Sequence, residues 1–162
     1  MDIRVRYASA DDLDQVNLIR REVNDLHVQG RADFFRADAW PSIEGHAADL
    51  LNAPDAGLIV AECGGQIAGF ATVEYFVKPA NPYMRERRYY HVEEFGVSSA
   101  FRRCGVGTAL IDFMKEDARA RGFDRIELDM WEFNRSALAF YEHTGFTTYR
   151  RYMELSASPD QD

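Results

Sequence analysis

The chain of 162 residues lacks most of the features that mark secreted or membrane-bound proteins. It has only two cysteines, Cys63 and Cys104, which cannot form a disulfide framework and favour a reducing compartment. No apolar run approaches the roughly 20 residues of a membrane-spanning helix. The N-terminal stretch MDIRVRYAS also lacks the apolar segment of a signal peptide. We therefore expect a cytoplasmic protein with no membrane partner.

Positive charge is scarce as well. The sequence has 27 acidic and 19 basic residues, and its formal net charge is −8. General nucleic-acid binding needs a basic face, so a nucleic-acid partner is not expected. The negative charge suits a cationic small-molecule substrate, although solubility alone also accounts for it. Length and composition predict one domain over residues 1–155 and a disordered tail at 156–162, with a core that needs no metal or disulfide.

Apolar periodicity predicts alternating strands and helices. The first half is expected to contain a strand at 3–8, a helix at 9–27, a short helix at 41–51 and a hairpin at 56–77 that turns at Gly64-Gly65. The second half is expected to contain a strand at 89–97, a helix from 106, a strand at 123–131, a helix at 134–145 and a last strand at 146–155. One helix joins the strand ending at Val97 to the next strand, so these two are predicted to lie parallel with a right-handed crossover.

The turn from Arg102 to Gly107, RRCGVG, joins a strand to a helix. A helix N-terminus leaves backbone N–H groups unpaired and carries partial positive charge. Gly105 and Gly107 let a ligand come close to the backbone, and Arg102 and Arg103 add full charges. This pattern indicates an anion site, most naturally for a phosphate or pyrophosphate. The spacing fits neither a Walker loop nor a dinucleotide fingerprint. The alternative is a turn eased by glycine, with solvated arginines.

A second pattern lies in NRSALAFYEHTGF, residues 134–146. Asn134 and Tyr141 are seven residues apart, close to two helical turns, so they share a face of the predicted helix. Ala137 lies between them, and a small residue there would let a slender ligand lie along the helix. The alternative for each residue alone is structural, with Asn134 as a cap and Tyr141 as a core aromatic.

Together the two stretches resemble motifs of the GNAT superfamily of acyl-CoA-dependent N-acetyltransferases. Residues 97–107 are similar to its R/Q-x-x-G-x-G/A loop, and residues 134–146 are similar to its second motif. The resemblance implies an α/β fold of GNAT type: a mixed, largely antiparallel twisted sheet with a central parallel strand pair and helices on both faces. It also implies acetyl-CoA as cosubstrate, with no metal.

The resemblance assigns residues to the cosubstrate. Backbone N–H groups from Cys104 to Thr108 would hold the pyrophosphate, and the strand edge at Phe95 and Val97 would pair with the pantetheine arm where the two parallel strands splay. The implied cosubstrate-binding residues are Phe95, Gly96, Val97, Arg102, Arg103, Cys104, Gly105, Val106, Gly107, Thr108, Asn134, Ala137 and Tyr141.

Acetyl transfer to an amine needs a base, an oxyanion site and an acid for the leaving thiolate. Tyr141 is the expected acid, and a backbone N–H of the strand ending at Val97 is expected to stabilise the oxyanion. Glu93 is the first candidate for the base. Glu94 stays open because a bulge would upset the alternation of side chains along the strand. His91 and ordered water are further alternatives.

The acceptor is less defined by the sequence. The family resemblance places the acceptor site at NDLHVQGRADFF, residues 24–35, and its polar and aromatic side chains suit a cationic, partly apolar amine. The candidates are Asp25, His27, Asp33, Phe34, Phe35, Tyr75 and Tyr83, all of which have packing or surface roles as alternatives. We therefore expect acetyl transfer from acetyl-CoA to a primary amine of a small molecule by direct attack in a ternary complex. A protein or peptide acceptor and a non-catalytic acyl-CoA-binding sensor are the alternatives, and a homodimer is compatible with the family.

Overall fold

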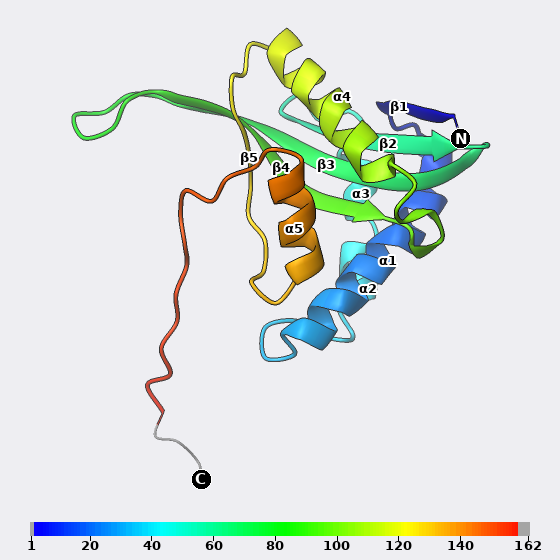
Figure 1. The fold of residues 1–162 in the computed structure, drawn as a ribbon, viewed down its shortest axis with the longest axis horizontal. Helices are drawn as coiled ribbons and strands as arrows, with labels where there is room; N and C mark the ends of the chain where they lie inside the picture. Colours follow the sequence, from blue (N-terminus) through cyan, green and yellow to red (C-terminus); the bar gives the residue numbers. More distant parts are fainter. Residues whose placement is uncertain (1, 159–162) are drawn as a thin grey trace.

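One five-stranded sheet organises the computed structural model, which describes residues 2–158 (Figure 1). Strand order follows the chain, β1-β2-β3-β4-β5. All neighbours are antiparallel except β4 and β5, which are parallel. The elements are β1 Ile3–Tyr7, α1 Leu13–Gly30, α2 Trp40–Ile43, α3 His46–Asp49, β2 Ala56–Cys63, β3 Gln66–Lys78, β4 Arg87–Val97, α4 Val106–Ala120, β5 Ile126–Leu128 and α5 Arg135–His143, with 3₁₀ turns at Ala10–Asp12 and Ser99–Phe101. The predicted fold class is confirmed.

Helices cover both faces of the sheet (Figure 1). Alternate residues of β2 point to opposite sides, so that Leu58 and Val60 face α1 while Ile59 and Ala61 belong to the cluster under α4. The α4 side holds the larger core, and the residues that α4 itself contributes to it are Val106, Leu110, Ile111, Met114 and Ala118. This packing fixes the position of α4, whose first turn follows the RRCGVG stretch.

One local prediction, the turn at Gly64-Gly65, is confirmed by backbone geometry. Gly64 and Gly65 both have positive φ, 56° and 79°, as a tight turn between β2 and β3 requires. Before α1, the Asp12 carboxylate accepts hydrogen bonds from the Ser9 backbone N–H at 2.8 Å and from the Arg6 guanidinium at 2.7 Å. The Arg6 contact holds the pKa of Asp12 at about 2, so this carboxylate is ionised wherever the protein is folded at ordinary pH.

The C-terminal part of the sheet differs from the prediction. β5 is only three residues long, and the strand predicted at 146–155 is wrong, because residues 146–158 carry no helix or strand. A strand needs a partner for its backbone groups, and this segment forms no ladder with any described residue. The tail predicted as disordered is irregular at 156–158, and its residues 159–162 lie outside the described part.

Two smaller differences concern the helices. The short helix predicted at 41–51 is two separate turns, α2 and α3, with Glu44 and Gly45 between them. α1 extends to Gly30, beyond the predicted end at residue 27. Among the described helices, none is both long and apolar enough to cross a bilayer.

A bulge lies in β4, opposite the step from Thr72 to Val73 in β3. Glu94 pairs with Thr72 and Val92 pairs with Val73, so Glu93 is the extra residue. The Thr72 hydroxyl accepts a hydrogen bond from the Glu94 backbone N–H at 2.9 Å and closes the bulge on that side. Beyond the bulge, Phe95 and Val97 face the α4 side.

Candidate active site

β4 and β5 pair over only three residues and then separate. Tyr90, His91 and Val92 pair with Ile126, Glu127 and Leu128, and the described residues form no further β4–β5 ladder. From Glu93 to Val97, β4 therefore has β3 on one side and no strand on the other. The aromatic rings of Phe140 and Tyr141 from α5 lie against Phe95 in this stretch, with centroids 5.7 and 5.9 Å away. The predicted splay of the parallel pair is thus present.

The turn before α4 presents an uncapped helix N-terminus. Gly105 occupies the cap position at φ 84°, and no side chain caps the helix there. The first backbone bond of the helix runs from Ala109 N–H to the Gly105 carbonyl at 3.0 Å, so the N–H groups of Val106, Gly107 and Thr108 have no partner within the helix. Arg103 also has positive φ, 64°. Arg102 and Arg103 are exposed beside these donors, an arrangement that suits an anionic group.

The two glycines of this turn have different surroundings. A side chain at Gly105 would point into open space, where its nearest neighbour is Ile3 Cδ1 at 3.8 Å. A side chain at Gly107 would meet the Phe140 ring, with its Cβ 2.9 Å from Cζ. Gly107 therefore permits close packing of α4 on α5, a role that the sequence pattern did not indicate. The open approach to the backbone lies at Gly105.

Helix α5 carries the other predicted cosubstrate residues. Asn134 caps it, with Oδ1 accepting a hydrogen bond from the Ala137 backbone N–H at 3.2 Å. Two turns later, Tyr141 packs against Phe95, Phe140 and Phe146, with ring centroids 5.4 to 5.9 Å apart. Burial raises the pKa of Tyr141 to about 12, so its phenol keeps its proton at neutral pH. Among residues 2–158, burial alone accounts for this pKa, with no contribution from a hydrogen bond or a neighbouring charge.

The two candidate bases are placed differently. Glu94 faces α1 and forms a two-point ion pair with Arg20, at 2.7 Å to Nε and 3.0 Å to Nη2. Arg20 is 4% exposed and also donates to the backbone carbonyls of Ile43 and Glu44. Glu94 is thus the counter-ion of a buried cation. A proton taken up by Glu94 would leave that cation without its partner.

Glu93 is freer. Its side chain is 53% exposed, and one carboxylate oxygen lies 3.2 Å from Nε2 of His91. The bulge places these two side chains together at the point where β4 and β5 separate. A carboxylate with an adjacent imidazole can accept a proton and pass it on. The geometry therefore favours Glu93 over Glu94 as a base, with His91 beside it.

Glu22 of α1 is a site residue that the sequence reasoning missed. Its carboxylate accepts a hydrogen bond from the Ser99 backbone N–H at 2.9 Å and lies 3.9 Å from the Arg102 guanidinium. It therefore anchors the turn that leads from β4 to the α4 N-terminus. The contact joins residues that are 77 positions apart in the chain, and no local pattern signals it.

Aromatic side chains converge beside the end of α1. Phe34 and Phe35, predicted on the acceptor side, both pack edge-on against Trp131, at 5.1 and 5.3 Å. His27 stacks on Phe35 at 5.2 Å and also contacts Phe133. Burial lowers the pKa of His27 below its ordinary value, and the nearby negative charge of Glu94 opposes this only in part. Neither Trp131 nor Phe133 was predicted for the site, because Trp131 was expected only as the end of a strand and Phe133 lies between two predicted elements.

Several predicted acceptor residues lie elsewhere or are already paired. Tyr83 is 92% exposed in the β3–β4 connection, and Asp33 forms an ion pair with Arg31 at 2.8 Å. Tyr75 is hydrogen bonded to Tyr7 at 3.0 Å, on the α4 side of the sheet. Asp25 is exposed on α1. The acceptor candidates that the structure brings together are therefore His27, Phe34 and Phe35.

Comparison with known proteins identifies the family. The model of the acetyltransferase (GNAT) family matches residues 21–146. The chain belongs to the GNAT family. Glucosamine 6-phosphate N-acetyltransferase of Trypanosoma brucei brucei is 37% identical over 65 residues, which are 40% of this chain and 42% of the relative. The chain spans less than half the length of the curated relatives it matches.

Two solved structures share the fold of this GNAT chain. A mutant of the BH1408 protein from Bacillus halodurans superposes with a TM-score of 0.91 at 24% identity, covering 96% of this chain and 99% of that one. The aminoglycoside acetyltransferase AAC(6')-Iy, in complex with a bisubstrate analogue of CoA and acetylneamine, has a TM-score of 0.73 at 18% identity, covering 98% and 100%. At these identities the likeness shows the fold alone.

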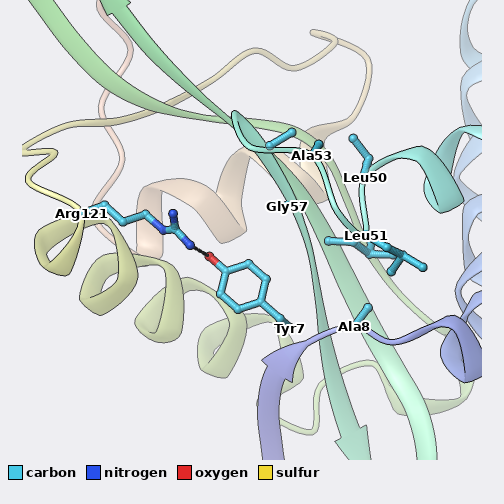
Figure 2. A pocket seen from close by; sticks show the side chains of 9 residues that line it. Tyr7, Ala8, Leu50, Leu51, Ala53, Gly57 and Arg121 are labelled. Atoms are coloured by element: carbon cyan, nitrogen blue, oxygen red, sulfur yellow. Dashed lines mark hydrogen bonds between the residues drawn. The ribbon is translucent and has the colours of Figure 1, made fainter.

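A separate hollow lies at the opposite edge of the sheet. It has a volume of about 190 Å³ and lies between Tyr7 at the end of β1, Leu50 and Leu51 after α3, and Arg121 after α4 (Figure 2). Arg121 donates to the Tyr7 hydroxyl at 2.9 Å and to the Asp117 carboxylate at 3.0 Å. The charge of Arg121 is therefore already balanced by Asp117. The hollow lies at the β1 edge of the sheet, the edge opposite β5.

Proposed function

We propose that this GNAT protein transfers an acetyl group from acetyl-CoA to a primary amine of a small molecule, in a ternary complex. The observation that carries the proposal is the unpaired stretch of β4 after Val92, with Tyr141 packed against Phe95 at its side. An extended amide chain adds readily to such an edge. A module that only binds acyl-CoA also needs this strand edge, but it does not need the protonated Tyr141 or the exposed Glu93 carboxylate beside the edge.

The residues present fit acetyl-CoA. The N–H groups of Val106, Gly107 and Thr108, together with Arg102 and Arg103, would hold the pyrophosphate. The edge at Phe95 and Val97 would bind the pantetheine amides, and Ala137 would leave room along α5. Acetyl-CoA supplies an activated acyl group with a thiolate leaving group. No metal enters the proposal.

The protein's own groups would serve three steps. Glu93, with His91 at 3.2 Å, would accept the proton of the acceptor ammonium and so free its lone pair. A backbone N–H in the unpaired part of β4 would stabilise the oxyanion. Tyr141 would donate its proton to the leaving thiolate, and its pKa of about 12 keeps that proton available over the working range of pH.

The acceptor is proposed to be a small amine that carries positive charge. The carboxylate of Glu93 and the aromatic faces of Phe34, Phe35 and Trp131 suit a cation with apolar parts. The names of the relatives support a small amine as acceptor, since they describe acetylation of glucosamine 6-phosphate and of aminoglycosides. A cytoplasmic location is proposed because Cys63 and Cys104 are both free thiols.

Thiol release from acetyl-CoA tests this function. Polyamines, aminoglycosides, amino acids and short basic peptides are offered in turn, and free CoA is measured. We expect turnover with at least one small amine and not with the peptides. Turnover with peptides alone would favour a protein acceptor, and an absence of turnover with bound acetyl-CoA would favour a sensor.

Cofactor binding can be tested separately from turnover. Coenzyme A should raise the melting temperature by mass action, and pantetheine without phosphates should raise it far less, because it lacks the group that the α4 N-terminus would hold. Equal shifts from both compounds would show that the turn at residues 102–107 is not the anchor.

A further inference from the structure

Thr72 of β3 is a buried polar side chain in an otherwise apolar part of the sheet. It is 2% exposed and lies between Ala71 and Val73, which both belong to the core cluster under α4. Because side chains alternate along a strand, Thr72 faces α1, as Phe70 does two residues earlier. Valine has nearly the same shape as threonine and would avoid the cost of burying a hydroxyl. The hydroxyl is therefore expected to make a hydrogen bond that compensates for its burial.

The hydroxyl binds a backbone group at the bulge of β4. The Glu94 N–H donates to Thr72 Oγ1 at 2.9 Å. At a bulge two residues of one strand, here Glu93 and Glu94, oppose one residue of its partner, here Thr72. The hydroxyl of that partner residue supplies an acceptor in addition to its backbone carbonyl. Arg20 also binds the Glu94 carboxylate at 2.7 Å, so Glu94 is held at both its backbone and its side chain.

The bulge decides which backbone N–H groups of β4 face the gap beside β5. Before the bulge, the Tyr90 N–H donates to the Arg125 carbonyl at 2.9 Å, on the β5 side. After the bulge, the Ser98 N–H donates to the Ala68 carbonyl at 2.9 Å, on the β3 side. Tyr90 and Ser98 are an even number of residues apart, so in a regular strand their N–H groups would point the same way. The extra residue at the bulge reverses that direction.

Phe95 is the residue directly after the hydrogen bond between Thr72 and Glu94. Because the Glu94 N–H is bound on the β3 side, the Phe95 N–H points to the other side, where the described residues place no strand. Tyr141, the proposed acid, packs against Phe95 with ring centroids 5.9 Å apart. The Phe95 N–H is thus one peptide away from the Thr72 contact and beside the group that would protonate the thiolate.

On the basis of the proposed acetyl transfer, we propose that Thr72 is a positioning residue for this reaction. Its hydroxyl holds the Glu94 N–H and thereby aims the Phe95 N–H at the oxyanion that forms on the reacting carbonyl. Such a donor raises the rate only within hydrogen-bond distance of the oxyanion, and a displacement on the order of 1 Å can cost about 10²-fold. Thr72 acts through the backbone of β4 and touches no reacting atom.

The chain can lose this hydroxyl without losing the bulge. A side chain at Gly96 would meet the Phe70 ring, with its Cβ 2.8 Å from Cε1, so glycine is needed where β4 packs on Phe70. A slip of β4 by one residue would bring the side chain of Phe95 or Val97 to that place. The register is therefore held independently of Thr72, and Thr72→Val should loosen the bulge without removing it.

Steady-state kinetics tests the positioning role, with an amine that the unaltered protein acetylates. Thr72→Val keeps the shape and removes the acceptor, so the maximal rate should fall by roughly 10- to 100-fold while the KM for acetyl-CoA stays unchanged. Thr72→Ser returns the hydroxyl and should restore most of the rate. Val60→Ala is the matched control, because Val60 of β2 is also buried on the α1 side; it should lower the melting temperature and leave the maximal rate unchanged.

The pH dependence separates Thr72 from the proposed base, Glu93. The loss of rate in Thr72→Val should persist at alkaline pH, because an oxyanion forms there as well, whereas a loss that acts through Glu93 would shrink once the amine needs no base. A loss that disappears at alkaline pH would overturn the proposal. Thr72→Ser that is as slow as Thr72→Val, or Val60→Ala that is as slow, would overturn it too.

Amide hydrogen exchange at Glu94, followed by NMR without any substrate, tests the Thr72–Glu94 hydrogen bond separately from the reaction. Exchange should be roughly five- to tenfold faster in Thr72→Val than in Thr72→Ser or the unaltered protein, the equivalent of one hydrogen bond. Unchanged exchange in Thr72→Val would overturn the proposal. If the unaltered protein acetylated no amine, the proposed function would fail and the positioning role with it, and faster exchange in Thr72→Val would then show a hydrogen bond of structural use only.

Discussion

The ring of Phe140 fills the space that a side chain at Gly107 would need. The distance from the ideal Cβ position at Gly107 to Phe140 Cζ is 2.9 Å, shorter than any ordinary contact. The same ring stacks on Phe95 of β4, with centroids 5.7 Å apart. Phe140 therefore packs between Gly107 of the proposed phosphate turn and Phe95 of the strand that would hold the thioester. A shift of the turn would be transmitted to β4 through the packing of Phe140.

The first prediction follows from that contact. Gly107→Ala should destabilise the fold by about 1–3 kcal/mol, the usual cost of overpacking, and should weaken CoA binding. Phe140→Leu in the same chain should recover most of the stability by making room for the methyl group. Thermal unfolding of the two single variants and the double variant gives the coupling energy. Additive effects would contradict the packing role of Gly107.

Gly105→Ala is the matched control for this experiment. Its side chain meets only open space, but φ 84° costs roughly 1–2 kcal/mol for a residue with a Cβ. Its loss of stability should therefore not be recovered by Phe140→Leu. Recovery there as well would mean that Phe140→Leu stabilises the fold in a general way.

The second prediction concerns the carboxylate beside the phosphate turn. Glu22 accepts the Ser99 N–H at 2.9 Å and stands 3.9 Å from Arg102. Glu22→Gln keeps an acceptor for Ser99 and removes a negative charge near the proposed anion site. CoA should therefore bind several-fold more tightly at low salt, and the gain should shrink as salt screens it. Titration calorimetry at two salt concentrations measures this.

Glu22→Ala serves as the control, because it removes the anchor together with the charge. It should loosen the turn and bind CoA no more tightly than the unaltered protein. If Glu22→Gln and Glu22→Ala gave the same affinity, the hydrogen bond to Ser99 would have no part in shaping the turn.

The third prediction concerns Tyr141. Tyr141→Phe keeps the ring packed against Phe95, Phe140 and Phe146, so acetyl-CoA affinity should be unchanged. The maximal rate should fall by roughly 10²–10⁴-fold, the range of general acid catalysis. Because burial raises the pKa to about 12, the phenol stays protonated between pH 7 and 10, and Tyr141 should add no falling limb there. A rate that is unchanged in Tyr141→Phe would mean that the thiolate leaves without an acid.

Local patterns predicted the parts of this fold that depend on local chemistry. The Gly64-Gly65 turn, the start of α5 at Asn134 and the turn before α4 each rest on a few neighbouring residues, and all three are present. The prediction of a last strand at 146–155 was wrong for a physical reason. The aromatic and β-branched residues of FTTYRRYMEL suit a strand, but a strand also needs a partner edge, and a single sequence does not say which edge that is.

In the candidate site, too, local motifs were predicted and contacts between distant residues were not. The motifs predicted the α4 turn and α5, but they did not predict Glu22, Arg20, Trp131 or Phe133, whose roles depend on contacts between distant parts of the chain. The two adjacent glutamates could not be separated by sequence alone. The bulge at Glu93 decides which of them faces Arg20, and a bulge is a property of the paired strands.

The last prediction separates Glu93 from Glu94. Glu94→Gln leaves the buried Arg20 cation without its counter-ion and should destabilise the fold by about 1.5–3 kcal/mol. Glu93 is half exposed, and its ion pair among the described residues is with His91, so Glu93→Gln should change stability by no more than about 0.5 kcal/mol. Thermal unfolding of the two variants measures this difference without any substrate.

Glu93→Gln should have little effect on stability but a large effect on catalysis. If Glu93 takes the ammonium proton, Glu93→Gln should lower the maximal rate by roughly 10²–10⁴-fold near neutral pH and leave CoA binding intact. The loss should shrink at alkaline pH, where the acceptor amine has already lost its proton and needs no base. Glu93→Asp should restore part of the rate at neutral pH, since it returns a carboxylate. Steady-state rates from mildly acidic to alkaline pH measure all three effects, and a Glu93→Gln profile that matches the unaltered protein would assign the base to His91 or to ordered water.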